Sequence, residues 1–415
     1  MRNYEHIAKK ITTVLFLSQS LSSAGFIAAF TVNALVGVDL TGLTAMAGVP
    51  GALYVTGQAL GALVWGYSFE RIGRRWGLAL GQMAGVFGSV IAITAVHERS
   101  FLFFLIGLVL VGMARSAVDL GRFVAAEVHL PEKRGRAISH VVLGSTVGAI
   151  LGPLLVGPTG HLAMIVGFPE LAGPYGVGFV VLVLAAILIL SGLRPEPRDI
   201  GRELGSMQRE AGSVHEARAL SQIVRQPYVI VAMVTMVFAQ MVMMVPMSIT
   251  SLHMKMNRHP LTFISLVISA HTLGMYAFSL ISGRMTDHWG RMPVIVLGSM
   301  VLILSCSIAA PSVDLLPLMV ALFLLGLGWN FTYVAGSALL ADQLSPKERA
   351  KTQGFNDLLL NLASAGSQVG SGLLYAIGGF SLTSAASAVL AIAPLAAVVW
   401  SQAARRKDHI TVKGK

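Results

Sequence analysis

Charged residues and cysteine are both scarce in this chain. Of its 415 residues, 12% are charged and only Cys306 is a cysteine, whereas 55% are hydrophobic. Soluble domains carry about 25% charged residues, and one soluble core could not hold so much apolar material. A single cysteine also excludes a disulfide framework and a zinc site built from cysteines. The composition therefore indicates a membrane protein.

Motifs for catalysis and for ATP use are missing as well. The sequence contains no HExxH, no GxSxG and no GxxxxGK[ST] pattern. These patterns would supply a metal-assisted base, an activated serine and a phosphate-binding loop. We therefore expect that the protein is not an enzyme, that it has no cofactor and no resident metal, and that ATP is not its direct energy source.

Long apolar runs are what the sequence has in abundance. Twelve of them approach the roughly 20 residues that cross a bilayer as a helix. They cover residues 11–37, 43–66, 77–97, 101–127, 138–165, 172–193, 226–253, 260–283, 293–312, 315–341, 354–379 and 381–403. The first run is too long for the apolar part of a signal peptide, so we expect it to be retained. The predicted fold is an all-α integral membrane protein with 12 transmembrane helices.

Basic residues are distributed unevenly between the connecting segments. If the N-terminus is cytoplasmic, 25 Lys and Arg residues lie in inside segments, and only Arg99, Lys255 and Arg258 lie outside. The positive-inside rule therefore predicts that both termini are cytoplasmic. The net charge of +11 then follows from topology and from contact with anionic membrane lipid, and it requires no nucleic acid.

A polar stretch divides the apolar runs six and six. Residues 194–225 contain no run of membrane length. They predict a cytoplasmic linker between an N-terminal six-helix bundle at 1–193 and a C-terminal one at 226–403, followed by a cytoplasmic tail at 404–415. Within the linker we expect a short amphipathic helix that lies on the membrane surface.

Two loops of the first half recur in the second half. "GYSFERIGRR" (66–75) matches "GRMTDHWGRM" (283–292) at an offset of 217, and "AAEVHLPEKRGR" (125–136) matches "LADQLSPKERAK" (340–351) at an offset of 215. Chance rarely places two separate loops at nearly one spacing. Duplicated six-helix halves are typical of secondary transporters.

The repeated pattern G-x-x-x-D-x-x-G-R-[KR], with twelve runs and a long central loop, resembles the major facilitator superfamily over essentially the whole chain. The resemblance implies two pseudosymmetric bundles, alternating access, and a loop latch that stabilises the outward-facing state. The candidate latch residues are Gly66, Glu70, Gly73, Arg74, Arg75, Gly283, Asp287, Gly290 and Arg291. Glu70 replaces the usual aspartate, and Met292 replaces the second basic residue. Tight glycine turns carrying inside-positive charge would give the same pattern.

The fifth run contains glycines at four-residue spacing in "GSTVGAILGPLLVG". Such spacing clears one face of a helix for close approach of a neighbour, and a proline bends the chain. The residues are Gly144, Gly148, Gly152, Pro153 and Gly157. They resemble a signature of proton-coupled exporters in the superfamily, which implies export and a place in the bacterial cytoplasmic membrane. Ordinary helix packing would leave the same residues.

Three charged residues lie inside the fourth run. Arg115, Asp119 and Arg122 project from one helix face, with the carboxylate between two guanidinium groups. Each charge would cost at least ~2.5–3.5 kcal/mol if it faced lipid, so we expect all three to face the protein interior. Asp119 is the one acid well inside a run, which makes it the first candidate for a coupling proton. A static ion network remains the alternative, and His271 in the eighth run is the second candidate.

The substrate pocket is expected in the second half. Methionines adapt to apolar partners of different shape, and a few polar or aromatic groups orient a ligand. The candidates are Gln240, Met241, Met244, Trp329, Asn330, Asn361 and Gln368. Methionines also simply fill cores. The first run has no acid where many exporters carry one, and it offers Ser22, Ser23 and Asn33.

Together these patterns predict a monomeric, proton-coupled antiporter of the multidrug type that expels small amphipathic or hydrophobic compounds. A proton-coupled uptake symporter is the nearest alternative. An exporter of a metal or metallophore is another, and it depends on convergence of methionines with His253 and His259. The remaining alternative is a sensor or a structural membrane protein that transports nothing.

Overall fold

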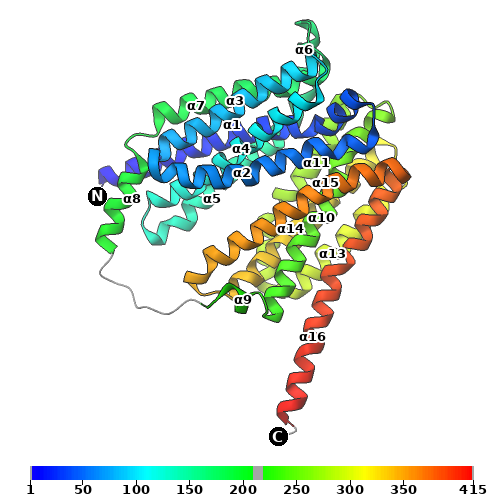
Figure 1. The fold of residues 1–415 in the computed structure, drawn as a ribbon. Coiled ribbons are helices and arrows are strands. Elements are labelled where there is room, and N and C mark those ends of the chain that lie inside the picture. Colours follow the sequence, from blue (N-terminus) through cyan, green and yellow to red (C-terminus); the bar gives the residue numbers. More distant parts are fainter. Residues whose placement is uncertain (1, 209–217, 414–415) are drawn as a thin grey trace. The chain divides into compact units, whose positions relative to one another are not determined.

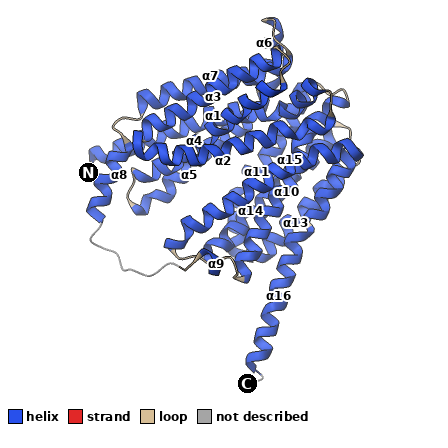
Figure 2. Ribbon diagram, in the orientation of Figure 1, coloured by secondary structure: helices blue, strands red, loops and turns tan. Residues whose placement is uncertain are grey.

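The computed structural model describes residues 2–208 and 218–413. Residues 209–217 of the predicted linker and residues 414–415 of the predicted tail lie outside the described part. Within that part every regular element is a helix (Figure 2). Two compact units divide the chain: unit 1 holds Met1–Val214 and His259–Ser269, and unit 2 holds His215–Arg258 and Ala270–Lys415.

Unit 1 is built from long helices with short connections (Figure 1). Its elements are α1 (Arg2–Thr41), η1 (Thr44–Gly48), α2 (Val49–Ile72), α3 (Arg74–His97), α4 (Phe101–Glu127), α5 (Pro131–Leu154), α6 (Val156–Ile165), η2 (Glu170–Ala172), α7 (Gly173–Gly192) and α8 (Pro197–Gln208). Helix α1 packs on α5 and α7, whereas α4 packs on α2 and α3. Buried apolar residues from these helices, Ile11, Leu78 and Ile189 among them, form its core.

Unit 2 repeats this construction. Its elements are α9 (Leu220–Ile223), α10 (Pro227–Met256), α11 (Leu261–Tyr276), α12 (Ser279–Trp289), α13 (Arg291–Ala309), α14 (Leu315–Asp342), α15 (Pro346–Leu390) and α16 (Ile392–Lys413). The first residues of α11 group with unit 1. Helix α10 packs on α14 and α15, and α13 packs on α14. Val229, Met236, Ile295 and Leu340 lie in its core.

Eleven helical segments in the described chain are long and apolar enough to cross a membrane. The last of them, Lys351–Ala403, has 53 residues, about twice the number that a bilayer needs. It is interrupted at Gly378 and Gly379, where φ of Gly379 is +64°, a backbone conformation that favours glycine. This break falls on the last two residues of the eleventh predicted run, just before the twelfth. The prediction of an all-α integral membrane protein is therefore confirmed.

The polar stretch after α7 contains a helix, as expected, but its apolar side does not lie free for a membrane. Ile200 and Leu204 of α8 are buried and belong to the core of unit 1. Helix α8 packs on α3 and α4. We expected a helix on the membrane surface, and this was wrong for these two residues, because they cover apolar side chains of the bundle instead.

Candidate functional site

Asp119 of α4 forms an ion pair inside unit 1. Its Oδ2 lies 3.1 Å from Nε of Arg115, one helical turn earlier. The Asp119 side chain is 37% exposed, whereas that of Arg115 is only 18% exposed. Arg115 also donates to Ser23 Oγ at 3.4 Å and lies over the ring of Phe26. The pair is therefore partly solvated and held against α1.

The predicted triplet is reduced to a pair. The Nε atom of Arg122 is buried without a hydrogen-bond partner in the described chain. Its guanidinium lies 4.8 Å from the centroid of the Phe123 ring. The prediction that the carboxylate lies between two guanidinium groups was wrong, because the Arg122 side chain turns toward its aromatic neighbour.

Gln19 of α1 completes the surroundings of Asp119, and the sequence reading missed it. Its amide nitrogen lies 3.3 Å from Asp119 Oδ1 and 2.7 Å from Oγ of Ser145 on α5. One buried amide thus joins α1 to both α4 and α5. The other polar residues noted on this helix have structural roles: Ser22 bonds to Gln82, and Asn33 accepts a hydrogen bond from Tyr175.

Gln240 of α10 forms the same kind of bridge in unit 2. Its amide nitrogen donates to Ser364 Oγ on α15 at 2.9 Å, and its Oε1 accepts from Nε1 of Trp329 on α14 at 2.9 Å. Two of the predicted pocket residues, Gln240 and Trp329, are therefore in direct contact. We name the sets Gln19–Asp119–Ser145 and Gln240–Trp329–Ser364 the first and second glutamine bridges.

The two bridges are related by the internal repeat. Gln240 follows Gln19 by 221 residues and Ser364 follows Ser145 by 219, close to the offsets of the repeated loops. The loop alignment pairs these residues only when a gap of four residues, about one helical turn, is placed between the loops and the apolar runs. The bridges differ in charge, because the first holds a carboxylate and the second an indole.

The other predicted pocket residues divide into three groups. Met244 is buried and Met241 half-buried. Asn330 points away from the second bridge and donates to the Met275 carbonyl at 2.6 Å, where α11 ends. On α15, Asn361 is half-buried, and Gln368 is 1% exposed with an Nε2 atom that has no described partner.

His271 is fully buried in unit 2. Its Nδ1 lies 2.9 Å from the Leu322 carbonyl, and its Nε2 has no partner in the described chain. This geometry is that of a core histidine satisfied by one backbone bond. The histidines of the metal alternative do not converge either: His253 stacks on Phe380, and no described group of three or more His, Cys, Asp and Glu could hold a metal ion.

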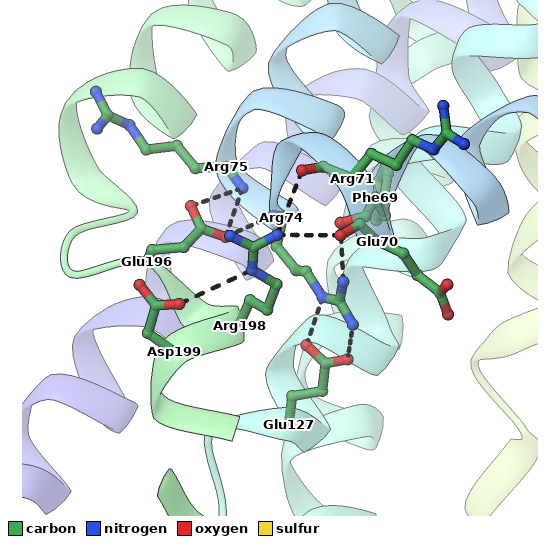
Figure 3. A network of polar contacts seen from close by, with 9 residues as sticks. All are labelled: Phe69, Glu70, Arg71, Arg74, Arg75, Glu127, Glu196, Arg198 and Asp199. Atoms are coloured by element: carbon green, nitrogen blue, oxygen red, sulfur yellow. Dashed lines mark hydrogen bonds and ion pairs between the residues drawn. The ribbon is translucent and has the colours of Figure 1, made fainter. Parts of the chain in front are cut away.

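The first latch loop is held by ion pairs and helix capping (Figure 3). Arg74 donates to Glu127 through Nε at 2.8 Å and Nη2 at 2.6 Å, and to the Phe69 carbonyl at 2.9 Å. The backbone N–H groups of Arg74 and Arg75 donate to Glu196. These are free donors at the start of α3, where a carboxylate is favoured by the helix dipole.

The side chain of Glu70, the acid predicted to act in this loop, takes no part in the described contacts that hold the loop. Arg198 of α8 donates to the carbonyls of Glu70 and Arg71 at the end of α2, whereas the Glu70 carboxylate points away from the network (Figure 3). A cavity of about 660 Å³ adjoins these groups, lined by Glu70, Arg74, Phe123, Ala126, Glu127, Arg134, Arg198, Gly201 and Arg202. The latch side chains therefore have room to change partners.

The second latch loop repeats this geometry within unit 2. Arg291 donates to Asp342 at 2.9 Å and to the Thr286 carbonyl at 3.0 Å. Asp287 lies 3.6 Å from the same arginine. Gly73 and Gly290 end α2 and α12 with φ of +89° and +88°, which explains why both repeats carry glycine there. Cβ atoms at Gly66 and Gly283 would meet nothing within 4 Å.

The fifth-run glycines bring α5 against the backbone of α1. A Cβ on Gly144 would lie 2.6 Å from the Phe16 carbonyl oxygen, and one on Gly152 would lie 2.5 Å from that of Ala24. Between them, Gly148 faces the carbonyl of Ser20 even more closely. Pro153 lies in the last turn of α5, and Gly157 faces Thr262. The stripe thus brings Ser145 within reach of Gln19.

The end of the linker is anchored in unit 2. Glu348, 4% exposed, accepts two bonds from the Arg218 guanidinium at 2.7 and 2.8 Å and one from the Ser345 N–H at 2.9 Å. With Ser345 it forms a capping box at the start of α15. The Arg218 guanidinium first, and then the Ser345 N–H, hold the pKa of Glu348 well below its ordinary value.

Comparison with known proteins decides the family. The sequence profile of the Major Facilitator Superfamily matches residues 15–262 and 247–414. The chain belongs to the major facilitator superfamily. It is 34% identical to the MFS-type transporter YdeG of Bacillus subtilis over 95% of this chain and 92% of that protein. It is 30% identical to the riboflavin transporter RfnT of Brucella anthropi, over 85% and 86%.

Other relatives and solved structures agree with this assignment. The multidrug resistance protein MdtL of Shigella flexneri is 38% identical over only 21% of this chain and 22% of that protein. The crystal structure of a D-xylose-proton symporter has a TM-score of 0.71 at 16% identity, covering 94% of this chain and 96% of the symporter. At that identity the likeness shows the fold. As a major facilitator protein the chain is a multi-pass membrane transporter and not an enzyme.

Proposed function

We propose that this transporter is proton-coupled and that Asp119 carries the coupling proton. The observation that carries the proposal is the Arg115–Asp119 pair, an acid deep within an apolar run that is 37% exposed and bound to one guanidinium. A coupling acid must be reachable by water and must have a partner that can leave when it is neutralised. Protonation of Asp119 would release Arg115, and loss of the proton would restore the pair.

Export is the direction we propose, for small amphipathic or hydrophobic compounds. The close approach of α5 to α1 along the glycine stripe supports it, together with the partial match to MdtL. The transporter would act as a monomer in lipid of the bacterial cytoplasmic membrane, with both termini inside. The latch loops, held by Arg74–Glu127 and Arg291–Asp342, would stabilise one of its alternating states.

A second candidate is transport of riboflavin or a related ring compound. The similarity to RfnT extends over 85% of this chain, far more than the similarity to MdtL. The stacked rings of Trp329 and Tyr333 suit a planar solute. Vesicles of opposite orientation separate the candidates: energised everted vesicles accumulate an exported compound such as ethidium, whereas right-side-out vesicles accumulate an imported one such as riboflavin.

Asp119→Asn tests the coupling role. It keeps the size of the side chain and removes the titratable group, so proton-driven flux in proteoliposomes should be lost while exchange without a gradient survives. Asp39→Asn is the matched control, because Asp39 also pairs with an arginine, 3.4 Å from Arg99, at the end of α1. Full proton-driven flux through Asp119→Asn protein would refute the proposal.

A further inference from the structure

Two aromatic rings stack on each other beside the second glutamine bridge. Trp329 and Tyr333 lie one turn apart on α14, with ring centroids 4.7 Å apart and planes inclined by 17°. Both residues are half-buried. A further planar ring can extend such a stack, as nucleobases do on aromatic side chains.

An oriented amide lies at the edge of these rings. Gln240 accepts from the Trp329 indole and donates to Ser364, both at 2.9 Å, so both ends of its amide are fixed in place. A glutamine amide has two N–H donors and two carbonyl lone pairs. Gln240 therefore keeps one donor and one acceptor, which match the acceptor and donor of an amide or imide edge.

A second amide on α15 has unused hydrogen-bonding capacity. Gln368 is 1% exposed, and its Nε2 has no partner in the described chain. It lies one helical turn after Ser364 and so on the same face of α15. An unpaired buried polar atom destabilises the protein, which makes it a group that a ligand can satisfy.

Charge is absent from the segments that surround this cluster. Residues 227–252, 315–341 and 358–390 contain no Asp, Glu, Lys or Arg. A charged ligand would lose hydration there without gaining a counter-ion, so a neutral ligand is favoured. The first bridge differs in this respect, because Arg115 and Asp119 adjoin it.

We propose that unit 2 binds the substrate, and that the substrate is a neutral planar heteroaromatic ring with an amide-type or imide-type edge. The ring extends the Trp329–Tyr333 stack at Trp329, its edge pairs with Gln240, and Gln368 provides a further donor. This inference rests on the proposed transport function, because it names the substrate class of that transporter. It gives the two bridges different roles: the first binds and releases the coupling proton, and the second binds the substrate.

Lumiflavin is a suitable probe, since it is neutral, tricyclic and carries an imide edge. Its fluorescence is quenched when it stacks on aromatic side chains, so binding to the purified full-length protein in nanodiscs can be titrated directly. Trp329→Leu should weaken binding about tenfold, the equivalent of one lost stacking contact. Trp400→Leu is the matched control, because Trp400 is an exposed tryptophan on α16.

The imide edge is tested separately with N3-methyl-lumiflavin, in which the imide N–H is blocked. The protein should prefer lumiflavin, and Gln240→Met should abolish that preference while keeping the side chain's length. Trp329→Phe retains a ring and loses only the indole bond, so it shows whether an effect of Trp329→Leu comes from stacking or from misfolding. Unfolding temperature is measured for every variant.

Absence of lumiflavin binding, or equal affinities for Trp329→Leu and Trp400→Leu proteins, would overturn the inference. These outcomes leave the transport proposal standing if Asp119→Asn still abolishes proton-driven flux of another compound. Conversely, lumiflavin binding that depends on Trp329, combined with normal coupled flux in Asp119→Asn, would support the site and refute the coupling role.

Discussion

At the scale of single residues, one amide determines how Asp119 is held. Gln19 donates to Asp119 Oδ1 at 3.3 Å, and Arg115 donates to the other oxygen at 3.1 Å. Gln19 also donates to Ser145 on α5. One side chain therefore links Asp119 of α4 to a third helix, which is the route by which the proposed proton carrier would act on α5.

Replacing Gln19 should therefore change the pH dependence of transport. Gln19→Leu removes the hydrogen bond that Asp119 Oδ1 accepts from the Gln19 amide, and so changes the surroundings of the proposed proton carrier. The pH profile of proton-driven flux should shift accordingly. Ser145→Ala is the control, since it removes only the other partner of Gln19. Identical profiles for Gln19→Leu and Ser145→Ala would exclude this positioning role.

Sequence alone could identify the charged residues of α4 but not their pairing. Helical spacing places Arg115, Asp119 and Arg122 on one face, yet rotamers decide contacts, and Arg122 packs on Phe123. Gln19 was overlooked because an uncharged amide in an apolar run gives little signal by itself. Its importance comes from α4 and α5 meeting it, and that arrangement depends on tertiary packing.

At the scale of helices, the glycines of α5 determine how closely it approaches α1. Gly148 faces the Ser20 carbonyl so closely that no side chain fits. Gly66, a predicted latch residue, differs physically, because a Cβ there meets nothing within 4 Å. Glycines that look alike in the sequence are thus required for different physical reasons, and only the structure distinguishes those reasons.

Gly148→Val should push α5 away from α1 and destabilise the protein by roughly 1–3 kcal/mol, as overpacked cores are. The unfolding temperature in detergent would fall, and the Gln19–Ser145 bond would be lost. Gly66→Ala should fold normally. If folded Gly66→Ala protein transports slowly, the residue serves another state of the transport cycle, whereas normal transport would support the simple turn interpretation of the loop.

The two latch arginines should differ in importance. Arg74 makes two bonds to Glu127 with side chains 17% and 33% exposed, whereas the Arg291 and Asp342 side chains are 29% and 47% exposed. Less solvated ion pairs contribute more. Glu127→Gln should therefore slow turnover more than Asp342→Asn, with little effect on substrate affinity. Equal turnover in both variants would contradict this ranking.

At the scale of the whole molecule, hydropathy and charge were enough to predict the fold. A helix in a membrane must form all its backbone hydrogen bonds within itself and must present apolar side chains to the lipid, and both requirements leave a clear pattern in the sequence. The number of runs and the loop repeats needed only sequence. The linker contacts did not follow from sequence, since Glu196, Arg198 and Glu348 look like ordinary linker and loop charges. Their role comes from the helix ends that they meet: the start of α3, the end of α2 and the start of α15.

The described ends of the linker are each fixed to the unit they adjoin. Glu196 caps α3 and Arg198 binds the end of α2 in unit 1, whereas Arg218 binds Glu348 in unit 2. Both attachments combine charge with helix capping. The strength of each anchor should therefore affect the stability of the unit to which it is attached.

The Arg218–Glu348 anchor should be insensitive to pH over the physiological range. Because the pKa of Glu348 is depressed in the folded protein, its stabilisation is complete above the ordinary carboxyl pKa and is lost only as pH falls through the depressed value. Glu348→Gln and Arg218→Gln should each lower the unfolding temperature at neutral pH. The unfolding temperature of the double variant should be little lower than that of either single variant, because each change removes the same interaction. Additive losses, or a wild-type anchor that weakens between about pH 8 and pH 6, would show that the two residues act separately.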